Sequence, residues 1–212
     1  VSAAVSQTVT TEGANQSTTG TCQDRAGNTA SDTQNGINID KTAPTLNLVN
    51  VSIEATSPAG ANVNYSALAS DNLDSSPTLN CLPASGGIYP LGTSAVTCTA
   101  TDDAGNTSAP DSFNITVVDT TPPTIDVADM TVYTFGILGK NVTYSSPATS
   151  DIVDGFGVAT CTPASESFFV LGNNHVTCSA TDAHGNTSIT SFVITVEEAE
   201  LTIATSSGFF IP

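Results

Sequence analysis

Apolar and polar residues alternate in short runs along most of this chain. Residues 62–68 and 112–117 place apolar side chains at about every second position, and clusters of Gly, Pro, Asn and Asp separate such runs. A period of two is typical of a strand with one buried face, because successive side chains on a strand point to opposite faces. Short alternating strands between turn signals predict an all-β fold built from sandwiches.

One pair of strands is predicted in more detail. Residues 102–106 and 182–186 each combine Asp, which bonds to its own backbone, with Gly, which readily takes a positive φ. We therefore expect each segment to be the loop of a β-hairpin. In the first hairpin, period two places six apolar side chains on two facing rows that should form the core, namely Val96, Cys98, Ala100, Phe113, Ile115 and Val117.

The same ordered set of residues occurs twice, about 80 positions apart. The pair Asp71 and Asp74 recurs as Asp151 and Asp154, and the motif Cys-x-Pro-Ala-Ser recurs with the same register. Residues 24–29 repeat the hairpin loop a third time. The repeat predicts the C-terminal half of a module at 1–40, complete modules at 41–119 and 120–196, and a strand-like tail or the start of a further domain at 197–212.

The charge balance narrows the choice of partners. Three Lys and Arg residues stand against 20 Asp and Glu, which gives a net charge of −17. Nucleic acid and anionic lipid would both require a basic patch, so neither is expected as a partner. The longest apolar stretches, such as residues 168–171, are too short for a membrane span.

Each complete module contains two cysteines with equal spacing. Cys81 and Cys98 form one pair, and Cys161 and Cys178 form the other. Neither pair has zinc-site spacing, so two intradomain disulfides are predicted, each stabilising a thin core by roughly 3 kcal/mol. Persistent disulfides indicate an oxidising, extracytoplasmic location, whereas the alternative is buried free thiols in a cytosolic protein. Cys22 is unmatched and would pair upstream in a longer chain or with another molecule.

These motifs together resemble the hyalin (HYR) repeat. The resemblance is carried by the proline joints at Pro122 and Pro123, the acidic pair, the Cys-x-Pro-Ala-Ser motif and the closing segment of each module. It implies tandem immunoglobulin-like β-sandwiches of the kind found in extracellular adhesive and surface-layer proteins, without catalysis of their own. Residues 1–40 fit only the latter half of such a module, so the N-terminal domain is expected to be incomplete.

Acidic residues at loops and joints are candidate ligands for Ca²⁺, which takes six to eight oxygen ligands. We expect any such ion where a hairpin tip meets the joint between modules. The alternative is that these residues form turns by bonding to their own backbone. The candidates are Asp40, Asp71, Asp74, Asp102, Asp103, Asp119, Asp151, Asp154 and Asp182.

Seven sequons are candidate sites for N-linked glycans. Alternation with apolar neighbours points Asn64 and Asn114 outward, and two others fall in hairpin turns. The full set is Asn15, Asn50, Asn64, Asn106, Asn114, Asn141 and Asn186.

An enzymatic function is not expected. The chain has two histidines, His175 and His184, and both are expected to be solvated surface residues. The sequence contains no G-x-S-x-G elbow, no H-E-x-x-H motif and no phosphate-binding glycine loop.

We therefore expect an extracellular or cell-surface structural protein that builds an appendage, filament or surface layer. Self-association is possible if the apolar tail at residues 201–212 adds strands to the incomplete N-terminal domain of another copy, giving a head-to-tail polymer. The alternative is a carbohydrate- or Ca²⁺-binding adhesin segment whose partners are neighbouring repeats of a much longer protein.

Overall fold

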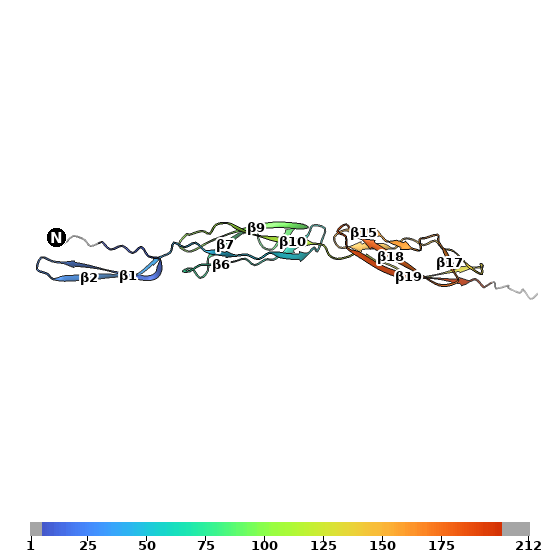
Figure 1. Cartoon of the computed structure of the whole chain (residues 1–212), viewed down its shortest axis with the longest axis horizontal. Helices are drawn as coiled ribbons and strands as arrows, with labels where there is room; N and C mark the ends of the chain where they lie inside the picture. The colour runs from blue at the N-terminus through green and yellow to red at the C-terminus, as the bar shows by residue number, and fades with distance from the viewer. Residues whose placement is uncertain (1–5, 201–212) are drawn as a thin grey trace, which may run out of the picture. The chain divides into compact units, whose positions relative to one another are not determined.

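A computed structural model describes residues 6–200, and these residues form strands, turns and loops without a helix (Figure 1). Contacts divide the chain into two compact units, one containing residues up to 53 with 60–118, the other containing 54–59 with the residues from 119 onward. The predicted all-β fold class is confirmed for these residues, which form several separate sheets. Of the tail predicted at 197–212, residues 201–212 lie outside the described residues.

The N-terminal part of the first unit is a single hairpin. Strands β1 (Gly13–Gln23) and β2 (Thr29–Ile39) pair antiparallel around the turn at residues 24–28. Within residues 6–200 no third strand joins this sheet, and most of its side chains are exposed. The hairpin therefore lacks the second sheet against which a sandwich domain packs.

The remainder of the first unit is the first complete repeat. Its main sheet has the order β4-β10-β9-β7, and two short two-stranded sheets, β3-β6 and β5-β8, supply further strands. The strands are β3 (Thr45–Asn47), β4 (Val51–Glu54), β5 (Ala61–Val63), β6 (Leu68–Ser70), β7 (Thr78–Leu82), β8 (Gly87–Tyr89), β9 (Gly92–Thr101) and β10 (Asp111–Val118).

The prediction of one strand through residues 62–68 is wrong. The chain leaves one sheet after β5, which pairs with β8, and joins another at β6, which pairs with β3. Between them the backbone N–H of Tyr65 donates to the Ser85 hydroxyl at 2.9 Å, so it is not available to a strand partner. A change of sheet within an alternating segment is invisible to a period-two pattern.

The second unit contains the second repeat, with a main sheet of order β12-β19-β18-β16. A three-stranded sheet, β11-β14-β15, and the pair β13-β17 complete it. The strands are β11 (Thr124–Ile125), β12 (Met130–Thr134), β13 (Gly139–Asn141), β14 (Ala148–Asp151), β15 (Gly155–Val158), β16 (Thr160–Thr162), β17 (Phe168–Val170), β18 (Gly172–Thr181) and β19 (Thr187–Glu198).

The two repeats differ at β15. This strand pairs with β14, and Gly157 lies opposite Thr149 in the pair. The residue at the position of Gly157 in the first repeat is Pro77, which has no backbone N–H and so is poorly suited to a ladder. The first repeat accordingly has no strand between Asp74 and β7.

The predicted core rows are confirmed. Val96, Cys98 and Ala100 on β9 are fully buried, as are the apolar residues that alternate along β10. The second repeat buries a matching cluster that includes Val176, Cys178, Phe192, Ile194 and Val196. Each repeat thus has its own hydrophobic core, formed mainly by the two long strands of its last hairpin.

Two glycines allow close approach of backbone segments. A Cβ atom on Gly60 would lie 1.9 Å from the carbonyl oxygen of Tyr89, and one on Gly139 would lie 2.0 Å from that of Phe169. Both residues have positive φ, at 105° and 131°. Only glycine meets both requirements, and its recurrence reflects the same crossing in the two repeats.

Candidate metal sites in the two repeats

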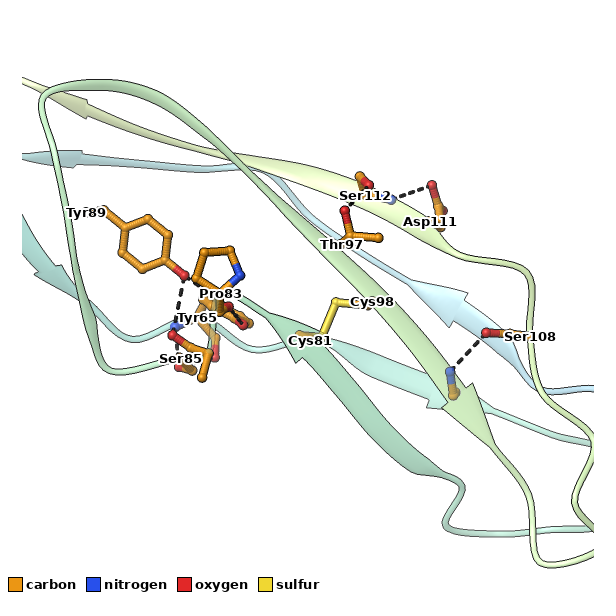
Figure 2. Close-up of a disulfide and its surroundings, with 12 residues drawn as sticks. Tyr65, Cys81, Pro83, Ser85, Tyr89, Thr97, Cys98, Ser108, Asp111 and Ser112 are labelled. Carbon is orange, nitrogen blue, oxygen red and sulfur yellow. Dashed lines mark hydrogen bonds between the residues drawn. A yellow bond between two sulfur atoms is a disulfide. The ribbon is translucent and has the colours of Figure 1, made fainter.

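The cysteines pair within each repeat. Cys81 bonds to Cys98 and Cys161 bonds to Cys178, with Cα atoms 4.1 and 4.0 Å apart. In both cases the two residues lie directly opposite each other on neighbouring strands of the main sheet, β7 with β9 and β16 with β18. Each disulfide therefore fixes the register of one strand pair, and Figure 2 shows the first of them, Cys81–Cys98. Cys22 is a free cysteine and is exposed on β1.

The rest of the Cys-x-Pro-Ala-Ser motif holds a tyrosine. The Tyr65 hydroxyl donates to the Pro83 carbonyl at 2.6 Å, and its backbone N–H donates to Ser85 (Figure 2). Tyr144 makes the same two bonds in the second repeat, with Pro163 and Ser165. Its ring packs edge-on against Phe192, with centroids 5.4 Å apart. The motif therefore has a structural role in anchoring an aromatic ring over the core.

A second motif shapes the hairpin loop, and it occurs three times. The carboxylate of Asp102 accepts bonds from the backbone N–H and the side-chain amide of Asn106, both at 2.8 Å. The pairs Asp24 with Asn28 and Asp182 with Asn186 repeat both bonds. Burial raises the pKa of Asp102, but the bonds from Asn106 outweigh it and lower the pKa overall. The loop thus holds an ionised carboxylate near the protein interior.

In the first repeat, three of the candidate residues converge. Asp40, Asp71 and Asp102 each have a carboxylate oxygen within 4.8 Å of the others. Asp71 Oδ1 accepts the backbone N–H of Leu73 and Asp74, whereas Asp71 Oδ2 is buried and has no hydrogen-bond partner among the described residues. Burial, followed by the charges of Asp71 and Asp102, raises the pKa of Asp40. The site concentrates negative charge where one oxygen lacks a donor.

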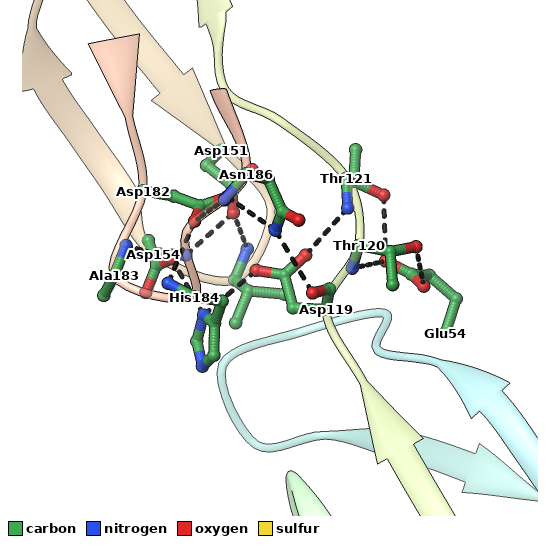
Figure 3. A network of polar contacts seen from close by, with 11 residues as sticks. Glu54, Asp119, Thr120, Thr121, Asp151, Asp154, Asp182, Ala183, His184 and Asn186 are labelled. Atoms are coloured by element: carbon green, nitrogen blue, oxygen red, sulfur yellow. Dashed lines mark hydrogen bonds and ion pairs between the residues drawn. The ribbon is translucent and has the colours of Figure 1, made fainter. Parts of the chain in front are cut away.

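The second repeat builds the equivalent group from Asp119, Asp151 and Asp182, again within 4.8 Å (Figure 3). Asp151 Oδ1 accepts the N–H of Val153 and Asp154, which repeats the arrangement at Asp71. Asp119 is 8% exposed, and its Oδ2 has no hydrogen bond in the described part of the chain. These two groups are the first Asp triad and the second Asp triad.

Two of the candidate residues do not join the first triad. Asp74 accepts the backbone N–H of Asp103 at 3.0 Å and that of Ser76 at 2.8 Å, so it stabilises the neighbouring loops. Asp103 itself is exposed. The turn-forming alternative thus describes Asp74. In the triads, Asp71 and Asp151 form turns through one oxygen and also converge with two other carboxylates.

His184 is exposed, as predicted, but the sequence did not reveal the two carboxylates that lie beside it. His184 Nδ1 lies 3.0 Å from Asp154 Oδ2 and 3.1 Å from Asp119 Oδ2 (Figure 3). The bond to Asp154 raises the pKa of His184 above its ordinary value. The sequence signal was its place in the loop, where the first repeat has Ala104. His175, on β18, is exposed as expected.

The sequons fall into two groups. The side-chain amides of Asn106 and Asn186, the atoms that would carry a glycan, donate to Asp102 and Asp182, and both residues are half-buried. The other five, Asn15, Asn50, Asn64, Asn114 and Asn141, are exposed.

Comparisons with known proteins agree with this architecture of tandem β-sandwich repeats. The family model of the HYR domain matches residues 39–117 and 118–196. The chain therefore belongs to the HYR-domain family, and the resemblance to hyalin repeats is confirmed. Each matched span includes one complete Asp triad, because Asp40 and Asp119 fall at the start of their spans.

Two curated relatives are both hyalins. The chain is 32% identical over 189 residues to hyalin of Strongylocentrotus purpuratus, covering 84% of the chain and 16% of that protein. It is 32% identical over 194 residues to hyalin of Lytechinus variegatus, covering 86% of the chain and 36% of that protein. The chain thus spans only a part of the length of these relatives.

Solved structures similar to the chain are cadherin repeats. Human CDH23 EC21-23 is 14% identical with a TM-score of 0.37, covering 78% of this chain and 68% of that one. Mouse protocadherin-24 EC1-3 is 14% identical with a TM-score of 0.34, covering 87% and 79%. Within residues 6–200 there is no helix with the length and apolar character needed to cross a bilayer.

Proposed function

We propose that this chain is a segment of an extracellular structural or adhesive protein whose repeats each bind Ca²⁺ at an Asp triad. The observation that carries the proposal is the recurrence of the same three-carboxylate group in both repeats, at positions 79 or 80 residues apart. Each group joins the segment that enters a repeat to two loops of that repeat. A bound ion would tie these three segments together.

The chemistry of the triads supports the binding of a hard divalent cation. Three carboxylates within 4.8 Å repel one another, and burial of part of the group strengthens that repulsion. Ca²⁺ binds carboxylate oxygens at 2.3–2.6 Å in flexible arrangements of six to eight ligands, which may include backbone carbonyls and waters. The free Oδ2 of Asp71 supplies a ligand atom without breaking a hydrogen bond of the turn.

Thermal unfolding with CaCl₂ or with a chelator tests this proposal. We expect Ca²⁺ to raise the Tm of the wild type, because the ion binds the folded state alone. Asp71→Asn combined with Asp151→Asn should abolish the increase. Asparagine can still accept the two backbone bonds of each turn, so the variant separates turn formation from charge.

Asp32→Asn serves as the matched control, because Asp32 is an exposed carboxylate on β2. It should respond to Ca²⁺ as the wild type does. Equal melting of the wild type with and without the ion would contradict the proposal.

An oxidising extracellular location is supported by the two cystines, which persist under such conditions. We propose N-linked glycans at the five exposed sequons and none at Asn106 and Asn186, whose amides are engaged. Mass spectrometry of glycopeptides from protein secreted by a eukaryotic host tests this distribution. Glycan on Asn106 or Asn186 would contradict it.

Assembly into a filament or surface layer is the remaining part of the proposal. The hairpin β1-β2 has no further strand partner among the described residues, which leaves it open to strand addition. The added strands come from the longer protein or from a second copy. Sedimentation of the chain over a range of concentrations distinguishes the two, because only a second copy makes the size depend on concentration.

A further inference from the structure

The second Asp triad differs from the first by an adjoining histidine. The two hairpin loops align residue by residue, and Ala104 in the first repeat corresponds to His184 in the second. His184 Nδ1 lies within 3.1 Å of carboxylate oxygens from two other segments, Asp154 Oδ2 and Asp119 Oδ2 (Figure 3). The second repeat therefore has a nitrogen donor where the first has a methyl group.

A hydrogen bond accounts for only one of these two contacts. Nδ1 carries at most one hydrogen, and its bond to Asp154 Oδ2 at 3.0 Å accounts for it. Asp119 Oδ2 has no hydrogen bond within the described chain, although it lies 3.1 Å from the same nitrogen. The Asp119 side chain is completely buried. A buried carboxylate oxygen without a hydrogen-bond donor is costly, so Asp119 Oδ2 needs a positive partner, which is either the protonated imidazole or a cation held between Nδ1 and the two carboxylates.

A small transition-metal ion fits this arrangement. Tetrahedral Zn²⁺ binds histidine nitrogen and carboxylate oxygen at about 2.0–2.2 Å, which places neighbouring ligand atoms about 3.3 Å apart. The distances from Nδ1 to Asp154 Oδ2 and Asp119 Oδ2, 3.0 and 3.1 Å, are within a few tenths of an ångström of that value. Imidazole nitrogen favours Zn²⁺ and related ions, whereas Ca²⁺ prefers oxygen alone.

We propose that Asp119, Asp154 and His184 form a site for a divalent transition-metal ion such as Zn²⁺, with water completing the coordination. The first repeat, which has Ala104 at the histidine position, has no such site. Asp119 also belongs to the second triad, so Zn²⁺ and Ca²⁺ compete in the second repeat only. The site does not depend on Ca²⁺ binding, because Asp154 and His184 lie outside the triad.

Calorimetric titration of the tag-free chain with ZnCl₂, in Ca²⁺-free buffer, tests the assignment. We expect one Zn²⁺ per chain. His184→Ala should weaken binding by about tenfold or more, since even residues that only support ligands contribute 10–100-fold. Asp154→Asn should have a similar effect, while its side-chain oxygen can still accept the backbone N–H of Ala183. His175→Ala, at an exposed histidine on β18, is the control and should bind as the wild type does.

A second readout reports the ligand directly. The chain has only two histidines, so comparison with the spectrum of His175→Ala assigns the ¹⁵N signals of both imidazole rings. Zn²⁺ should shift the His184 Nδ1 resonance and leave that of His175 in place. Equal Zn²⁺ affinity of the wild type and His184→Ala, an unshifted His184, or unchanged binding by Asp154→Asn would overturn the proposal. His184→Ala should retain stabilisation by Ca²⁺, so failure of the Zn²⁺ site and failure of the Asp triads give different results.

Discussion

Individual polar side chains in this protein act mainly by satisfying the backbone at places where the chain changes direction. Tyr65 and Tyr144 each bond to the carbonyl of a proline that follows a disulfide cysteine. Asp24, Asp102 and Asp182 each bind the backbone of a hairpin loop. These residues recur because each repeat needs the same turns.

Removing the tyrosine hydroxyl tests this role. Tyr65→Phe takes away the bond to Pro83 and leaves the ring against Phe113, at a centroid distance of 5.0 Å. We expect a loss of about 0.5–1.5 kcal/mol in the free energy of unfolding, measured by urea denaturation. Tyr133→Phe is the control, since Tyr133 is 60% exposed, and its free energy of unfolding should not change. An equal loss in both variants would contradict a specific role for Tyr65.

The pH dependence of the β1-β2 turn follows from Asp24. The bonds from the Asn28 side chain and backbone lower the pKa of Asp24 below its ordinary 3.8. Its stabilising contribution is therefore complete above the unfolded pKa and is lost as the pH falls through the lower, folded pKa. Asn28→Ala should raise the pKa of Asp24 toward 3.8. NMR titration of the carboxyl carbon measures this, and an unchanged pKa would contradict it.

At the scale of the elements, the formation of short strands depends on how closely two backbone segments can approach each other. Strand β13 has three residues and pairs with β17, and Gly139 at its start lies against the Phe169 carbonyl. Strand propensity contributes little over so few residues. The glycine decides whether the segments can meet.

Gly139→Ala should therefore be strongly destabilising, by more than about 1 kcal/mol, since it adds a steric clash to an unfavourable φ. Gly172→Ala is the matched comparison. Gly172 also has positive φ, at 94°, but its Cβ would meet nothing within 4 Å. Thermal unfolding should give the larger decrease in Tm for Gly139→Ala. Equal decreases would show that φ alone sets the cost.

Each disulfide also holds two paired strands together. Cys161→Ser combined with Cys178→Ser should cost about 2–4 kcal/mol, because the unfolded chain regains the freedom of the loop between them. Denaturant unfolding of the second repeat measures the loss. Cys22→Ser, at the exposed free cysteine, should leave stability unchanged.

At the scale of the whole chain, the repeats and the N-terminal hairpin differ in how many side chains they bury. The second repeat buries eight residues in one cluster, whereas the β1-β2 hairpin is a two-stranded sheet with few buried side chains. Isolated hairpins are marginal in water, while three or more strands with a core are stable. We therefore expect each HYR repeat to fold by itself and the hairpin not to.

Separate fragments test this difference. Residues 118–196, expressed under oxidising conditions, should give dispersed amide NMR signals and a cooperative thermal transition. A peptide of residues 6–40 should give neither. A cooperatively folded hairpin peptide would contradict the view that it needs further strands.

The sequence by itself determined the fold class, the family and the core faces, because local periodicity, turn residues and repeat spacing are properties of the chain order. It also placed Asp40, Asp71 and Asp102 among the candidate ligands. Only the tertiary structure decided that these three converge while Asp74 and Asp103 do not, since convergence depends on how distant loops pack. The same holds for His184, because its exposed position in the loop was predictable but the approach of Asp119 and Asp154 to it was not.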